Sequence, residues 1–266
     1  MTDQKRLTLI LDAMINVGLE ASQLVLPLFH DGCASQTKAD GSIVTIADTQ
    51  GEALITTRLR EMFPDVAMLG EESDAAGATP DLSGPYFCVD PIDGTKQFAS
   101  GDPEWVIALA YLEGGRPVAG VIVAPAFQGR LFAGLADFGG FEQAIDGTRT
   151  TFPPATNMNA PWRVLRGGHD TAASVAPYLP KDQKFEMRKV SSALKFGLIA
   201  AGEADIFIRA GRVWDWDIAA GQALIEAAGG EIRDLDGQRL VYGQAQNGYR
   251  HPPFIARGCN VLGLGK

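Results

Sequence analysis

Apolar and polar positions along the first half of the chain predict two helices followed by a sheet. Apolar residues recur every three or four positions over residues 4–30, the period of an amphipathic helix, which is expected to end near Gly32. A second helix is expected from about Ala47 to Phe63, because Pro64 cannot continue it. Short apolar runs between turn-rich segments then predict a meandering sheet with these strands: VAMLG before Glu71, YFCV before Asp90, WVIALAYL, PVAGVIVA and RLFAGL.

The second half of the chain alternates between strand and helix patterns. Residues 148–161 lose the apolar period and are rich in proline, threonine and asparagine, so we expect an N-terminal α+β subdomain over 1–152 and a C-terminal α/β subdomain over 153–266. Such alternation is typical of a mostly parallel sheet covered by helices. The expected order is WRVLRG strand, DTAASVAPYL helix, KFEMRKV strand, SALKFGLIAAGEA helix, DIFIRA strand, DIAAGQALIEAAGG helix and EIRDL strand.

The composition excludes several classes of protein. With 23 basic and 32 acidic residues the formal net charge is −9, which argues against nucleic-acid binding, since such proteins need a cationic surface. The three cysteines are far apart and form neither a zinc nor a disulfide pattern, which fits a reducing cytoplasm. Asp12, Asn16 and Glu20 interrupt the N-terminal apolar stretch, so we expect neither a signal peptide nor a membrane span.

Three acidic residues at the ends of predicted strands are candidates for a metal site. Glu71 and Asp90 each follow an apolar run, and Asp93 lies three residues farther on, within FCVDPIDGTKQF. Ligand sites of α/β proteins form at strand ends, and Mg²⁺ prefers carboxylate, carbonyl and water oxygens. Pro91 restricts the backbone between the two aspartates in a way that could direct the Ile92 carbonyl at the same ion.

The next two residues favour phosphate chemistry at this metal site. Gly94 and Thr95 offer backbone N–H groups and a hydroxyl at an expected helix start, which suits an anion. The acid spacing fits neither an EF-hand loop nor an aspartyl-phosphate phosphatase. On this stretch alone a structural alternative stays open, in which Asp90 ends a strand with a turn bond and Asp93 caps a helix.

Three motifs that occur together resemble those of one enzyme superfamily. GEES over 70–73, DPIDGT over 90–95 and WDIAAG over 216–221 resemble the inositol monophosphatase superfamily of magnesium-dependent, lithium-sensitive phosphomonoesterases. The resemblance extends from Lys38 to near Tyr242, and DGTKQF, SSALKF and ADIFIRAG look most like the CysQ-type 3′(2′),5′-bisphosphate nucleotidases within it. It implies an α+β fold, the layered αβαβα sandwich of the sugar-phosphatase type.

The resemblance also assigns metal ligands. It implies that Glu71, Asp90 and the Ile92 carbonyl hold one Mg²⁺, and that Asp90, Asp93 and Asp217 hold a second. Two such ions can orient a water and neutralise charge on a leaving oxygen. An N-cap aspartate would produce the same pattern at Asp217, and capping is compatible with metal binding.

Further acids receive lesser roles by the same resemblance. A third ion would lie more loosely, near Glu71 and Asp40, so two or three ions are expected. Thr95, backed by Asp48, would help Glu71 take the proton of the attacking water, without a covalent intermediate. Asp215 is expected either at the surface or behind the metal ligands.

Basic residues of the C-terminal part would select the substrate. By resemblance, Lys195 and Arg209 line a pocket for the second phosphate of a nucleotide, and His169 lies near its base. The ordinary alternatives are cations that are solvated or paired locally, and a structural histidine. The expected substrate contacts are Asp93, Gly94, Thr95, His169, Lys195, Arg209 and Asp217.

The sequence therefore predicts a Mg²⁺-dependent phosphomonoesterase that acts on a small phosphorylated substrate. The favoured reaction removes the 3′-phosphate of adenosine 3′,5′-bisphosphate and gives AMP, which would clear a by-product of sulfate assimilation. An inositol-1-phosphate or broader sugar-phosphate phosphatase is the alternative, and a catalytically silent metal-dependent binding protein is a remote one. The enzyme would act in the cytoplasm as a monomer or a homodimer.

Overall fold

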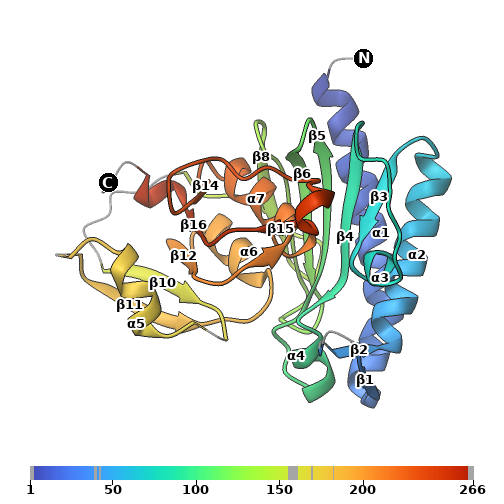
Figure 1. Cartoon of the computed structure of the whole chain (residues 1–266), viewed down its shortest axis with the longest axis horizontal. Helices are drawn as coiled ribbons and strands as arrows, with labels where there is room; N and C mark the ends of the chain where they lie inside the picture. The colour runs from blue at the N-terminus through green and yellow to red at the C-terminus, as the bar shows by residue number, and fades with distance from the viewer. Residues whose placement is uncertain are drawn as a thin grey trace.

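Five layers of alternating helices and sheets make up the chain (Figure 1). The structure is a computed structural model that describes residues 3–38, 41, 43–154, 161–168, 170–181 and 183–262. The αβαβα sandwich implied by the sequence is confirmed. The first layer consists of α1 (Asp3–Asp31) and α2 (Ile46–Met62), with the small hairpin of β1 (Ser35–Thr37) and β2 (Ile43–Thr45) between them in sequence.

The first sheet has seven strands in sequence order, and all neighbours are antiparallel except β3 and β4, which are parallel. The predicted meander is thus confirmed, while the last two strands, which are glycine-rich or exposed, were not predicted from the sequence. Two short helices, α3 (Glu71–Ala75) and α4 (Thr95–Ser100), follow β3 and β4. The strands are β3 (Ala67–Gly70), β4 (Tyr86–Asp93), β5 (Val106–Glu113), β6 (Arg116–Ala124), β7 (Arg130–Leu135), β8 (Gly139–Gln143) and β9 (Arg149–Thr151).

The second sheet has the order β11-β10-β12-β16-β14. β10 is parallel to β11 and β12, but β16, which follows the predicted alternation, is antiparallel to both of its neighbours, so this sheet is mixed. The strands are β10 (Trp162–Arg166), β11 (Phe185–Lys189), β12 (Ile206–Arg209), β14 (Glu231–Asp234) and β16 (Phe254–Arg257); β13 (Val213–Trp214) pairs separately with β15 (Arg250–His251).

Helices α6 (Leu194–Ala200) and α7 (Asp215–Ala227) form the middle layer between the two sheets (Figure 1). The helix expected near residue 175 is only α5 (Ala172–Val175), because Pro177 lies in the 3₁₀ turn that follows (Ala176–Tyr178). Two further 3₁₀ turns span Ala245–Asn247 and Cys259–Val261.

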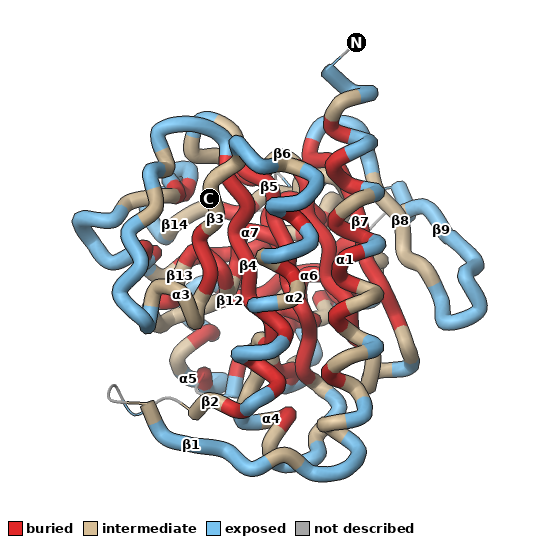
Figure 2. The backbone as a smooth tube through the Cα atoms, turned by 90° about the vertical axis from the view of Figure 1, so that its right-hand side faces the viewer, coloured by how far each residue is buried: buried red, intermediate tan, exposed pale blue. Residues whose placement is uncertain are grey.

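Two large apolar cores explain the layering. One core lies between the first sheet and α1 and α2, and the other joins the first sheet, α6, α7 and the second sheet. Figure 2 shows the central strands buried behind α1 and α2. Because the second core is shared, it crosses the boundary expected at 152/153, and the division into two subdomains stays a proposal.

Helix α1 bears on the expectation that the chain has no membrane span. Among the described helices, α1 alone has the length and apolar content of a spanning helix. Half of its apolar stretch is buried inside the protein, which is equally typical of a core helix.

Candidate active site

A β-bulge near the end of β4 brings two aspartates to one face of the first sheet. Side chains alternate along a strand, so residues three positions apart normally point to opposite faces. Asp90 pairs with Ala108 of β5 and Asp93 with Val106, so three steps along β4 match two along β5. Pro91 fits the bulge because it has no N–H to pair. The strand thus continues to Asp93, where the sequence had suggested a turn after residue 89.

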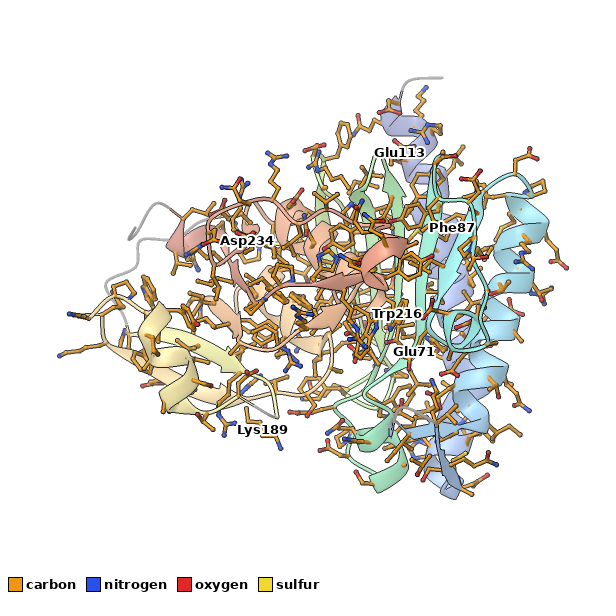
Figure 3. All side chains as sticks on the ribbon, in the orientation of Figure 1. Glu71, Phe87, Glu113, Lys189, Trp216 and Asp234 are labelled. Atoms are coloured by element: carbon orange, nitrogen blue, oxygen red, sulfur yellow. The ribbon has the colours of Figure 1, made fainter. Side chains whose placement is uncertain are left out.

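Asp217 reaches the same place from α7. The helix begins at Asp215, so Asp217 is its third residue and not its N-cap, which corrects the expected start. Oxygen atoms of Asp90, Asp93 and Asp217, one from each, lie within 4.8 Å of one another. The trio lies between the first sheet and α7, the region that Glu71 and Trp216 mark in Figure 3.

Backbone N–H groups hold each of these three carboxylates. Ile92 N donates to Asp90 Oδ1 at 3.0 Å, Trp214 N donates to Asp217 Oδ2 at 2.8 Å, and Ala193 N donates to Asp93 Oδ2. In the described part of the chain, no hydrogen bond reaches the other oxygen of any of the three. The bonds therefore fix each carboxyl group and leave one oxygen of each available as a ligand.

The trio fits a divalent cation. Burial raises the pKa of Asp217 to about 8, and the charge of Asp93 contributes to the rise. Burial likewise raises the pKa of Asp90, with the charges of Glu71 and Asp93 adding to the effect. A divalent cation would reverse this repulsion. Two oxygens bound to one Mg²⁺ at about 2.1 Å lie at most about 4.2 Å apart, so only a small adjustment of the trio is needed.

Glu71 lies at the start of α3. Its charge acts on Asp90, but its carboxylate pairs with a lysine. Lys38 Nζ donates to Glu71 Oε1 at 3.1 Å and to Glu72 Oε1 at 2.7 Å. Burial raises the pKa of Glu71 to about 7, against the charge of Lys38, which lowers it. The cluster of close carboxylate oxygens does not include Glu71. Asp40, expected near a third ion, lies outside the described residues.

Thr95 and Asp48 are in direct contact. Thr95 Oγ1 lies 3.0 Å from Asp48 Oδ1, to which it donates, and 3.2 Å from the Ile92 carbonyl oxygen. Asp48 Oδ2 accepts hydrogen bonds from the N–H and hydroxyl of Thr45 at 2.7 and 2.6 Å, as part of the capping box of α2. The first turn of α2 therefore holds the hydroxyl of Thr95 beside the bulge.

Gly94 forms the turn between β4 and α4. Its φ of 96° lies in the left-handed region, which residues with a Cβ rarely adopt. An added Cβ would also lie 3.3 Å from the Glu104 carbonyl and from Ser192 Cβ. Glycine thus lets the chain turn sharply enough for Asp93 and Thr95 to reach the same site.

A cavity of about 230 Å³ connects the acids to two basic residues. Asp93, Gly94 and Asp217 line it together with Lys195 of α6 and Arg209 of β12. The structure therefore brings together five of the seven expected substrate contacts. Thr95 lies beside the cavity without lining it, and His169 lies outside the described residues.

Lys195 is buried and its Nζ donates to the carbonyl oxygens of Val190, at 3.3 Å, and Ser192, whereas Arg209 is half-buried. Burial lowers the pKa of Lys195 to about 8, although Asp93 opposes the shift, and its Nζ lies 4.9 Å from the centre of the Phe207 ring. Arg209 contacts Asp170 at 3.4 Å through Nη1, while its buried Nε has no hydrogen-bond partner among the described residues. Two cationic side chains that line one cavity favour an anionic ligand there.

Comparison with known proteins identifies the family. Residues 7–254 match the inositol monophosphatase family. This chain belongs to that family. It is 33% identical over 205 residues to the 3′(2′),5′-bisphosphate nucleotidase CysQ of Salmonella typhimurium, covering 77% of this chain and 81% of the relative. It is 28% identical to the CysQ of Haemophilus influenzae over 94% of this chain and 93% of that protein. The chain is therefore a phosphatase of small phosphorylated substrates.

Solved structures of the family share the fold. CysQ from Bacteroides thetaiotaomicron aligns with a TM-score of 0.76 at 24% identity, over 94% of this chain and 97% of that one. A structure described as an IMPase/NADP phosphatase complexed with Mg²⁺ and phosphate aligns with a TM-score of 0.74 at 23% identity, over 94% and 91% of the two chains. The family is metal-dependent, in agreement with the carboxylate trio.

The loop before α6 contains residues to which the sequence assigned no role, although the motif SSALKF begins there. Ser191 and Ser192 line the cavity, and Ser192 has a φ of 54°, a strained value for a residue other than glycine. Glu104 accepts a hydrogen bond from Ser191 N at 2.8 Å, and Ala193 N reaches Asp93. Backbone strain such as that at Ser192, in a loop that lines the candidate active site, is typical of a functional loop. No local pattern reveals Glu104, because it lies 87 residues from its partner.

Asp215 is buried, which excludes the surface position left open for it. Its Oδ1 lies 2.7 Å from His251 Nε2, and its Oδ2 accepts a hydrogen bond from Gly243 N at 2.7 Å. Tyr249 also accepts a hydrogen bond, through its carbonyl, from Asp215 N at 2.8 Å. The C-terminal segment is thereby fastened to the first turn of α7, two residues before Asp217.

Proposed function

We propose that this phosphatase is a 3′(2′),5′-bisphosphate nucleotidase that converts adenosine 3′,5′-bisphosphate into AMP and phosphate. One observation carries the proposal: the cavity that holds the carboxylates also holds Lys195 and Arg209. A substrate with one phosphate needs only the metal ions that the carboxylates would hold, whereas a bisphosphate needs separate cations for its second phosphate. The names of the CysQ relatives support the same substrate class.

The chain's own acids would hold the ions. Glu71, Asp90 and the Ile92 carbonyl would bind one Mg²⁺, and Asp90, Asp93 and Asp217 a second. When bound, these ions supply positive charge for the phosphoryl oxygens and lower the pKa of water. The same proposal includes two or three bound Mg²⁺ ions and inhibition by lithium.

Two residues would handle the proton of the attacking water. Hydrolysis joins a water oxygen to phosphorus and breaks the bond to the 3′-oxygen, which takes up a proton. The carboxylate of Glu71 would accept the proton that the water loses. Thr95 would orient the water through its hydroxyl, which Asp48 holds.

The two basic residues of the cavity, Lys195 and Arg209, would bind the second phosphate of the substrate and contribute their charges to it. His169 is proposed near the base. A cytoplasmic monomer or dimer that removes a by-product of sulfate assimilation would follow from this activity.

Phosphate release from two substrates tests the proposal. With Mg²⁺ present, we expect kcat/KM for adenosine 3′,5′-bisphosphate to exceed that for inositol-1-phosphate at least tenfold, and chelation to abolish both activities. A preference for inositol-1-phosphate would make the chain an inositol or sugar-phosphate phosphatase. Metal binding without turnover of any phosphate ester would indicate a catalytically silent binding protein.

A further inference from the structure

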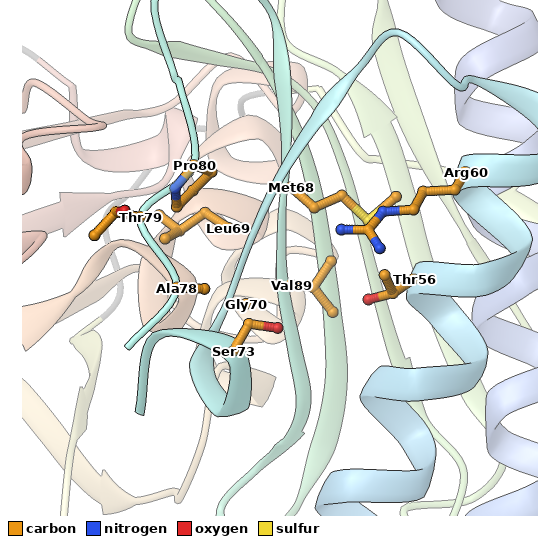
Figure 4. Close-up of a pocket in the computed structure, with 10 residues that line it drawn as sticks. All are labelled: Thr56, Arg60, Met68, Leu69, Gly70, Ser73, Ala78, Thr79, Pro80 and Val89. Carbon is orange, nitrogen blue, oxygen red and sulfur yellow. The ribbon is translucent and has the colours of Figure 1, made fainter. Parts of the chain in front are cut away.

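Helix α3, which begins with Glu71, lacks apolar anchoring. None of its five residues is buried. A cavity of about 260 Å³ adjoins it, lined by Gly70 and Ser73 and by residues of α2, β3 and β4 (Figure 4). Because packing does not fix this turn, hydrogen bonds must hold Glu71 in place.

One buried carboxylate on α2 supplies those bonds. Glu52 is only 5% exposed, and its Oε2 accepts a hydrogen bond from Glu72 N at 2.8 Å. Its Oε1 accepts one from Ser73 N at 2.8 Å and another from the Ser73 hydroxyl. These three donors converge on both oxygens, the arrangement that an ionised carboxylate satisfies. Bonds between a charged acceptor and backbone N–H groups are stronger than neutral ones.

Gly70 makes room for this contact. Its φ of −127° and ψ of 152° are allowed for any residue, so its backbone does not require glycine. An added Cβ, however, would lie 2.6 Å from Glu52 Cδ and 2.7 Å from both carboxylate oxygens. Glycine at this position therefore serves the approach of Glu52 to the first turn of α3.

The position of Glu52 on α2 relates it to the other half of the site. Asp48 lies four residues earlier, on the same face of the helix, and holds the Thr95 hydroxyl. One face of α2 thus supports both Thr95, through Asp48, and the peptide units that follow Glu71, through Glu52.

We propose that Glu52 is a positioning residue for Glu71. It contacts neither metal nor substrate; it orients the α3 turn so that the Glu71 carboxylate faces the aspartate trio. This inference rests on the proposed function, in which Glu71 is a metal ligand and proton acceptor. Loss of Glu52 should weaken metal binding and lower kcat, while nucleotide KM changes little, because the cations are on α6 and β12.

The test compares Glu52→Gln with a matched control. The glutamine keeps the shape, but its NH₂ group faces a donor, so one of the backbone N–H groups loses its acceptor. The control is Asp205→Asn: Asp205 is also buried and also accepts from a backbone N–H, that of Arg163 at 2.8 Å, but on the second sheet. Both variants should unfold at lower temperature than the parent.

Mn²⁺ titration followed by electron paramagnetic resonance gives a readout independent of turnover. We expect Glu52→Gln to weaken Mn²⁺ binding roughly 10- to 100-fold and to lower kcat by a similar factor, the range found for residues that orient metal ligands. Asp205→Asn should keep the Mn²⁺ affinity and kcat of the parent per folded molecule. Equal losses in the two variants, or parental Mn²⁺ affinity in Glu52→Gln, would overturn the proposal.

Gly70→Ala tests the same contact from its other side. It should reproduce the metal-binding loss by displacing the Glu52 carboxylate, and it should add little further loss in a Glu52→Ala background. Additive losses would overturn the proposal.

If Glu52→Gln does not fold, Ser73→Ala provides a second test. It removes only the hydroxyl contact and should weaken Mn²⁺ binding severalfold; an unchanged Mn²⁺ affinity would overturn the proposal. A parent that binds Mn²⁺ but hydrolyses no phosphate ester would refute the proposed function, while the Mn²⁺ titrations would still test Glu52.

Discussion

The acidic and cationic halves of the cavity are built in different ways. On the acidic side, backbone N–H groups hold the carboxylates of Asp90, Asp93 and Asp217, one oxygen each. On the cationic side, Arg209 keeps a buried donor without a partner among the described residues, and burial lowers the pKa of Lys195. The acids are oriented before any ligand binds, whereas Arg209 contacts a single acid, Asp170, at 3.4 Å and Lys195 donates to backbone carbonyls.

This contrast separates reaction from recognition. Rigidly held ligands contribute to the rate, since positioned charges act in the transition state without reorganising. The cations contribute mainly to binding, because a second phosphate would add charge-assisted hydrogen bonds to the contacts that Arg209 and Lys195 already make. Substitutions in the acidic half should therefore lower kcat, and substitutions in the cationic half should raise KM.

The largest effect is expected from Asp93→Asn. The change keeps the side-chain shape but removes one negative ligand from the trio, so charge stabilisation worth several kcal/mol is lost and kcat should fall roughly a thousandfold. Steady-state phosphate release at saturating substrate measures this loss. As a control, Asp12→Asn on the exposed face of α1 should leave kcat unchanged. Parental turnover by Asp93→Asn, or full activity of the parent with excess chelator, would contradict the role of the trio.

A smaller, substrate-specific effect is expected from Arg209→Ala and Lys195→Ala. Each should raise KM for adenosine 3′,5′-bisphosphate roughly ten- to a hundredfold, the ~1.4–3 kcal/mol of one charged hydrogen bond. Neither should alter the rate on inositol-1-phosphate, which has no second phosphate. Arg212→Ala, an exposed arginine that does not line the cavity, is the matched control. Equal losses on both substrates would assign Arg209 and Lys195 to structural support.

Local patterns in the sequence predicted most of the fold because they report it directly. The 3.6-residue period of α1 and the apolar runs of β4 to β7 correspond to faces buried in the two large cores. β8 and β9 lack such a signal, since β8 is only half-buried and β9 is exposed, and the strands depend on pairing, β8 with β7 and β9 with β8. β16 is apolar and buried, but its antiparallel position follows from its neighbours β12 and β14, which no local pattern indicates.

The site was predictable where a motif carries it and not where distant contacts do. DPIDGT indicated the two aspartates, but the bulge that turns both to one face appears only in the pairing of β4 with β5. Glu52 and Glu104 act on backbone groups 20 and 87 residues away. An acid at the i+4 position from Asp48, on the face of α2 that packs inward, is the one local signal that could have indicated Glu52.

The smallest effect expected from the same contrast is a pH dependence confined to the cationic half. Burial lowers the pKa of Lys195 to about 8, so its charge is present below that pH and is lost above it. The ratio of kcat/KM for adenosine 3′,5′-bisphosphate to that for inositol-1-phosphate cancels titrations common to both substrates, such as that of Glu71. This ratio should fall severalfold between about pH 7 and pH 9, and kcat/KM reports the free enzyme, in which no substrate anion raises the pKa of the lysine. In Lys195→Ala the ratio should be lower at pH 7 and independent of pH over this range. A ratio that stays constant in the parent, or that still falls in the variant, would show that Lys195 does not contribute its charge to the second phosphate.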